Sequence, residues 1–109
     1  MTNIRGIYAE SGIDMNQTAY VECHGTGTQA GDLTEMTAVS QAIVQTRSSK
    51  VPIIVGSVKP NIGHTEGAAG VAGMIKAVLI LEKGIIPPNG NFEKPNPNIK
   101  FKEWNIKVC

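Results

Sequence analysis

The chain contains only two histidines, His24 and His64, and they occur in similar surroundings. Each lies in a string rich in small and polar residues, VECHGTGTQAGD over residues 21–32 and GSVKPNIGHTEG over residues 56–67. Histidine is the side chain whose charge changes nearest to neutral pH, so it often takes part in chemistry. A single histidine is more often a capping or packing residue, but two in equivalent positions make chance placement a weaker explanation. We therefore take the two strings as a candidate reaction site.

Both strings follow segments that are expected to be strands. Thr18–Cys23 contains β-favouring residues, and Val51–Val58 is rich in valine and isoleucine. Helices are predicted after them, from about Leu33 to Gln45 and from about Glu66 to Lys83. In α/β sheets, ligands collect where strand ends lead into helices, because backbone donors and helix N-termini converge there. The sequence thus predicts an α/β fold with both histidines at strand ends.

Two further elements are expected near the termini, namely a helix over Thr2–Ser11 and a short strand over Trp104–Val108. Asp32 and Glu35 have the spacing of a capping box, so we expect them to cap the helix that follows the first string.

The helix expected over Glu66–Lys83 is apolar nearly all round and must therefore be covered on more than one side. Gly67, Gly70 and Gly73 recur near its start, where they allow another backbone to approach closely. Each costs about 1 kcal/mol of helix propensity relative to alanine, which a tightly packed neighbour would offset. Gly84 is the expected stop.

Composition excludes several classes of protein. The 109 residues are enough for one small domain, so we expect one unit over residues 1–109 with no internal domain boundary. A net charge of +1 leaves no strong field to attract nucleic acid or an anionic membrane. The start lacks a signal-peptide pattern, and the apolar stretch Gly67–Leu81 is shorter than the roughly 20 residues that a bilayer requires. We therefore expect a cytoplasmic location, no membrane contact and no nucleic-acid partner.

Two other kinds of site fit the strings poorly. The glycines of the first string do not match a dinucleotide fingerprint, because the third falls one place too late, and no lysine follows as in a phosphate-binding loop. Cys23, His24, His64 and Glu66 could suggest a metal site, but no pair has the spacing of zinc knuckles. Adjacent Cys23 and His24 should also point to opposite faces of a strand. We expect no metal.

The two strings resemble the histidine motifs of β-ketoacyl synthases of the polyketide synthase type, and the likeness extends from about Ile4 to Phe101. It implies a thiolase-like layered α/β fold, of which this chain is an incomplete part, a fragment of the C-terminal half. It also implies a decarboxylative Claisen condensation in polyketide or fatty acid biosynthesis, in which an acyl group on a cysteine is attacked by the carbanion equivalent of a malonyl-type thioester.

The resemblance assigns roles to residues of the two strings. His24 and His64 would stabilise the enolate left by decarboxylation, and Lys59 would organise the catalytic site through hydrogen bonds. Glu66 would be the acidic partner of Lys59. Each has a simpler explanation: Lys59 could be a solvated strand-end residue, and Glu66 a first-turn carboxylate favoured by the helix dipole.

Substrate delivery also follows from the resemblance. Thr26 and Thr28 would hydrogen-bond the amides of the phosphopantetheine arm of an acyl carrier protein, or they could simply belong to a glycine-threonine turn. No tightly bound cofactor is implied, and the intact domain would be a homodimer.

The chain departs from the family at the nucleophile. Neither Cys23 nor Cys109 matches the motif of the family's reactive cysteine, which belongs to the N-terminal half. Cys23 is expected to be a small buried residue. The resemblance therefore implies an acyltransferase whose fragment is inactive without the cysteine-bearing half. The alternative is a truncated, non-catalytic scaffold or partner-binding fragment, because the apolar helix would expose surface in isolation.

Overall fold

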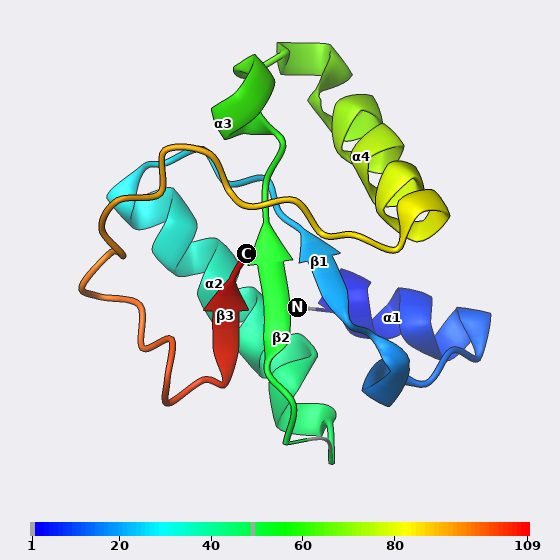
Figure 1. Ribbon diagram of the computed structural model, residues 1–109. Coiled ribbons are helices and arrows are strands. Elements are labelled where there is room, and N and C mark those ends of the chain that lie inside the picture. Colours follow the sequence, from blue (N-terminus) through cyan, green and yellow to red (C-terminus); the bar gives the residue numbers. More distant parts are fainter. Residues whose placement is uncertain (1, 49) are drawn as a thin grey trace.

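The computed structural model describes residues 2–48 and 50–109 and confirms the α/β fold. Three short parallel strands form a sheet in the order β1 (Tyr20–Glu22), β2 (Ile53–Gly56), β3 (Ile106–Val108), so that β2 lies in the middle (Figure 1). In the register of the sheet, Glu22 is paired with Gly56. The carboxyl ends of β1 and β2 are therefore neighbours, and the two strings that follow them start from one edge of the sheet.

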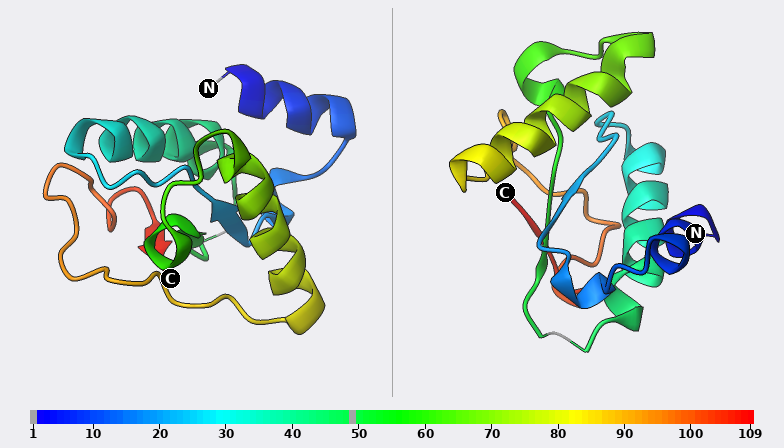
Figure 2. Two further views of the ribbon diagram at one scale, coloured as in Figure 1. Left: turned by 90° about the horizontal axis from the view of Figure 1, so that it is seen from above. Right: turned by 90° about the vertical axis from the view of Figure 1, so that its right-hand side faces the viewer.

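Helices lie on both sides of the sheet. Helix α2 (Gln29–Ala42) lies on one side, with α1 (Thr2–Ser11) beside it, and α4 (Ala69–Lys83) lies on the other (Figure 2). The core forms between α2 and the sheet, where branched and sulfur-containing side chains pack together. Its buried members are Cys23, Met36, Val39, Ala42, Ile43, Ile53, Val55, Ile99 and Ile106.

The start of α2 corrects one expectation. The helix begins at Gln29, not near Leu33, because Thr28 is the N-cap and its hydroxyl accepts the Gly31 N–H at 3.1 Å. A Cβ on Gly31 would lie 2.5 Å from the Thr28 Oγ1, so glycine in this first turn fits the cap. Asp32 and Glu35 consequently lie inside the helix and form no capping box.

The second helical segment differs from its prediction in a similar way. A 3-10 turn over Glu66–Ala68 precedes α4, which ends at Gly84 in the left-handed conformation (φ 65°), as expected. The short helix α3 (Lys59–Ile62) was not predicted. Four residues are too few to show a helical period, and Pro60 is tolerated because it stands in the first turn.

Only three residues of α4 are buried, Ala69, Gly73 and Lys76. Its apolar side chains are mostly exposed: Val71, Met74, Ile75, Val78, Leu79 and Leu81. The helix thus covers the sheet on one side only and leaves a broad apolar face uncovered. Among the described helices, none has both the length and the apolar character needed to cross a membrane.

Candidate active site

The two histidines lie together. The His24 ring follows β1 and the His64 ring follows α3, and they meet edge to face with centroids 5.3 Å apart and an interplanar angle of 87°. Both residues are exposed, so their rings are open to a substrate. The fold thus brings the two motif strings to one place, although His64 follows the unpredicted helix α3 and does not lie directly at a strand end.

The orientation of His64 is set by a backbone donor. Its Nδ1 accepts a hydrogen bond of 2.9 Å from the Glu66 N–H, and Glu66 takes a positive φ of 46°. A ring nitrogen that accepts a hydrogen bond carries no proton, so the neutral ring has its proton on Nε2. His64 can therefore present Nε2–H as a donor.

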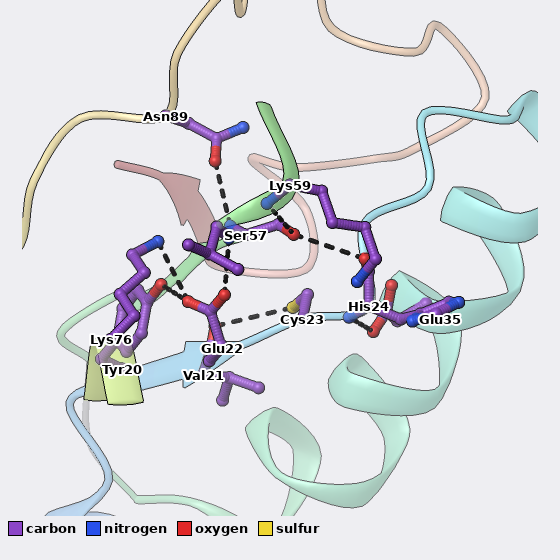
Figure 3. Close-up of polar contacts among 11 residues, drawn as sticks. Tyr20, Val21, Glu22, Cys23, His24, Glu35, Ser57, Lys59, Lys76 and Asn89 are labelled. Atoms are coloured by element: carbon purple, nitrogen blue, oxygen red, sulfur yellow. Dashed lines mark hydrogen bonds and ion pairs between the residues drawn. The ribbon is translucent and has the colours of Figure 1, made fainter. Parts of the chain in front are cut away.

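The backbone at His24 is held by α2. The Glu35 carboxylate accepts the His24 N–H at 2.5 Å and the Gly25 N–H at 2.9 Å (Figure 3). One turn earlier, Asp32 accepts the Gly27 N–H at 3.1 Å. Charge-assisted hydrogen bonds of this kind are stronger than neutral ones. Sequence reasoning missed this role, because capping-box spacing does not reveal which amides a carboxylate reaches.

Ser57 connects the two strings. It is 3% exposed, and its hydroxyl donates to the His24 carbonyl and accepts the Lys59 N–H, both at 3.3 Å (Figure 3). Its own N–H is donated to Asn89 Oδ1 at 3.0 Å. Gly25 allows this contact, since it has φ 51° and a Cβ there would lie 2.6 Å from the Ser57 Cβ. Ser57 and Asn89 were not singled out from the sequence.

His24 and Lys59 line one hollow of about 330 Å³. The Lys59 side chain extends toward His24 (Figure 3). Residues of α4, most of them small, complete the lining. The complete lining is Glu22, Cys23, His24, Lys59, Ala69, Gly70, Gly73, Met74 and Ala77. Lys59 is thus placed beside one of the two histidines.

Three other candidates are placed less directly. No ion pair or hydrogen bond joins the side chain of Glu66 to Lys59 within the described residues, and Glu66 is exposed. Thr28 caps α2, and Thr26 lies 3.3 Å from it, Oγ1 to Oγ1. Both threonines are exposed beside a larger hollow of about 520 Å³ that Gly25 and Gly27 line.

Cys23 lines both hollows, but its side chain is buried in the core. It is 8% exposed within the core, and its thiol contacts the Val21 carbonyl at 3.6 Å. Burial, followed by the charges of Glu35 and Glu22, raises the pKa of this thiol. A buried thiol of raised pKa is a poor nucleophile at neutral pH. The expectation of a small buried residue is confirmed.

Comparison with solved structures identifies the fold. The chain is similar to the ketosynthase from module 1 of the bacillaene synthase of Bacillus amyloliquefaciens, with a TM-score of 0.90 and 38% identity over 97% of this chain and 19% of that one. It is also similar to the ketosynthase from module 6 of the bacillaene synthase of Bacillus subtilis, with a TM-score of 0.89 and 41% identity over 96% of this chain and 19% of that one. The structure is therefore that of part of a ketosynthase domain.

Sequence comparison identifies the family. Residues 1–93 match the model described as the C-terminal domain of β-ketoacyl synthases. The chain is 54% identical to the highly reducing polyketide synthase tstA of Talaromyces stipitatus and 52% identical to the reducing polyketide synthase PKS1 of Cochliobolus heterostrophus, in each case over 105 residues and 96% of this chain. It spans only about 4% of the length of these relatives. The chain belongs to the β-ketoacyl synthase C-terminal domain family and is a fragment of such a domain.

Proposed function

We propose that this chain, as one unit over residues 1–109, is part of a ketosynthase that performs decarboxylative Claisen condensation in polyketide biosynthesis, which we expect in the cytoplasm. The observation that carries the proposal is the edge-to-face pair of His24 and His64, with His64 Nδ1 occupied by the Glu66 N–H. This arrangement leaves Nε2–H of His64 free to donate beside a second imidazole.

The reaction needs such hydrogen-bond donors when the enolate forms. When a malonyl thioester loses carbon dioxide, the carbon–carbon bond breaks and its electron pair forms an enolate, with negative charge on the thioester oxygen. Hydrogen bonds from His24 and His64 would stabilise that oxygen as in an oxyanion hole. The enolate carbon then attacks the acyl thioester, a new carbon–carbon bond forms, and the cysteine leaves as a thiolate.

Lys59 acts through its side chain in this proposal, whereas Glu66 acts through its backbone. The Lys59 ammonium lies in the hollow with His24, where its charge and its N–H groups can organise substrate and histidine. Glu66 contributes through its backbone N–H to His64. Its expected pairing with Lys59 would require a rearrangement on assembly with the rest of the domain.

The substrate would be delivered on the phosphopantetheine arm of an acyl carrier protein. The arm could run along the hollow of about 520 Å³ beside Gly25 and Gly27, with Thr26 and Thr28 hydrogen-bonding its amides. No tightly bound cofactor enters the proposal. The nucleophile would come from a cysteine-bearing N-terminal half. We expect that half to bind the uncovered apolar face of α4. The intact domain would be a homodimer.

The uncovered face of α4 also supports a second candidate, a fragment that binds a partner without performing chemistry. One experiment separates the two. Acyl transfer and malonyl decarboxylation are measured for this chain alone and for the assembled synthase, meaning this chain mixed with a purified ketosynthase half that carries the reactive cysteine.

Under the condensation proposal, activity is expected only in the assembled synthase, and His24→Ala, His64→Ala and Lys59→Ala each lower it. His24→Ala and His64→Ala should lower decarboxylation by roughly 100-fold or more, the scale for removal of an oxyanion donor. Thr37→Ala, in the middle of α2, is a matched control that should keep full activity. A folded mixture without activity would favour the non-catalytic fragment.

A further inference from the structure

Glu22 is the last residue of β1 and joins three elements through one carboxylate. Oε1 accepts the Val58 N–H at 2.6 Å, in the turn that follows β2. Oε2 accepts the Tyr20 hydroxyl and lies 3.0 Å from Nζ of Lys76, which comes from the middle of α4 (Figure 3). The carboxylate therefore ties β1, the turn after β2 and α4 to one another.

Both charges of this pair are nearly removed from solvent. The side chain of Lys76 is 9% exposed and that of Glu22 is 12% exposed. Within the described residues, Lys76 Nζ has no hydrogen bond besides this ion contact, although it lies 5.4 Å from the centroid of the Tyr20 ring. Because such burial is costly, a buried pair is weak evidence for a role in stability alone. The burial of Glu22 and Lys76 therefore points to a role beyond stability.

The joined elements surround the hollow of about 330 Å³ that His24 and Lys59 line, and residues of α4 complete its wall. His24 is two residues beyond Glu22, and Lys59 directly follows Val58. Gly73 of α4 packs on the Glu22 side chain, since a Cβ at Gly73 would lie 3.1 Å from Glu22 Cγ. A shift of the Glu22 carboxylate would therefore move His24, Lys59 and α4 relative to one another.

We propose that Glu22 is a positioning residue of the reaction, which sets the distance between Lys59 and His24, and that Lys76 neutralises its charge. This inference rests on the proposed condensation. An uncompensated carboxylate beside this hollow would oppose the negative charge of the enolate, and the Lys76 ammonium removes that opposition. The pair thus holds the turn with an ionic acceptor without adding net charge to the site.

The test uses Glu22→Gln, Lys76→Met and the double variant in the assembled synthase. Glu22→Gln keeps the shape but leaves a buried ammonium without a counter-charge. Each single variant should lower kcat of malonyl decarboxylation by about 10- to 100-fold, with KM within about twofold. Glu22→Gln acts by misplacing the catalytic groups by about 1 Å, and Lys76→Met acts by leaving the Glu22 carboxylate uncompensated beside the enolate. The double variant has no uncompensated charge and should regain most of kcat. The exposed pair Lys100–Glu103 is the matched control, and Lys100→Met with Glu103→Gln should change neither constant.

The outcomes separate this inference from the proposed function. If the unmodified assembled synthase is inactive, the condensation proposal falls and the positioning role falls with it. If it is active and folded Glu22→Gln and Lys76→Met variants keep full kcat, only the positioning role is overturned. The same holds if the double variant is no better than the single ones. Should Glu22→Gln fail to fold, Lys76→Met, which keeps the bond to the Val58 N–H, decides alone.

Discussion

The Ser57 hydroxyl bridges the backbones of two residues from different motif strings, the carbonyl of His24 and the N–H of Lys59. This single buried group fixes the end of one strand against the turn that follows its neighbour. Because the His24–His64 contact depends on where those two backbones lie, the bridge links the fold of the sheet edge to the chemistry proposed for it.

Ser57→Ala should therefore weaken both stability and activity. It removes one hydrogen bond to the His24 carbonyl and leaves the Lys59 N–H without its acceptor, which costs about 1–3 kcal/mol of unfolding free energy for a buried group. Urea unfolding followed by the fluorescence of Trp104, the only tryptophan, measures the loss. Ser11→Ala removes an exposed hydroxyl that donates to the Tyr8 carbonyl and should stay within about 0.5 kcal/mol of the unmodified chain. If Ser57→Ala and Ser11→Ala lower the free energy of unfolding equally, the Ser57 bridge contributes no more to stability than an exposed hydrogen bond.

Gly25→Ala should be among the most damaging glycine substitutions. The added methyl group meets the Ser57 Cβ at 2.6 Å, and the residue must also keep a φ of 51°. Backbone strain and overpacking, each about 1–3 kcal/mol, add at this position. Two controls separate the causes, and both have open space around the added methyl group. Gly27→Ala (φ 77°) should show the strain alone, and Gly6→Ala, inside α1, should stabilise by about 1 kcal/mol. A Gly25→Ala variant as stable as Gly27→Ala would contradict the close approach.

Local pattern was sufficient for much of the fold. β-Favouring residues predicted β1 and β2, and the helix over Thr2–Ser11 has the bounds that its apolar spacing indicated. Gly84 was correctly taken as the end of α4. These features depend on residues close together in the chain, which is why one sequence is enough to predict them.

The supporting contacts of the site could not be predicted, because each joins residues far apart in the chain. Glu35 reaches His24, Ser57 meets Asn89, and Glu22 binds Lys76. No spacing rule indicates such pairs. The sequence did identify the two histidines, since glycine-rich strings at strand ends are a local signal, but it missed the groups that hold them.

The exposed face of α4 leads to a prediction about assembly. Val78 is 57% exposed and lies between Met74 and Leu81 on this face. Val78→Asp places a charge where the proposed half would exclude water, so binding of the two halves should weaken by at least about 10-fold. Sedimentation of the mixture measures the affinity. Glu82→Gln, on the same helix but already polar, is the control and should bind normally. If Val78→Asp leaves binding unchanged, the partner does not cover this face.

Stability should fall at alkaline pH because of two weakly acidic groups, the buried thiol of Cys23 and the half-buried hydroxyl of Tyr20. Burial, the Glu35 charge and the Glu22 charge raise the pKa of Cys23 from its ordinary 9.0, and burial with the hydrogen bond to Glu22 raises the pKa of Tyr20 from its ordinary 10.0. Each group keeps its proton in the folded chain but loses it in the unfolded chain once the pH passes the ordinary value. The stability contribution is thus fully present below about pH 9 and declines above it, by at most about 1.4 kcal/mol per pH unit for Cys23.

The variant Cys23→Ala isolates the contribution of the thiol. It lowers stability at neutral pH, because it removes a buried side chain from the core, but its unfolding free energy should decline less steeply between about pH 9 and about pH 10 than that of the unmodified chain. Urea unfolding at a series of pH values gives both slopes. Alkylation provides an independent check, since a buried thiol of raised pKa should react with iodoacetamide only after denaturation. Parallel slopes, or rapid labelling of Cys23 in the folded chain, would show that the thiol is not held protonated in the core.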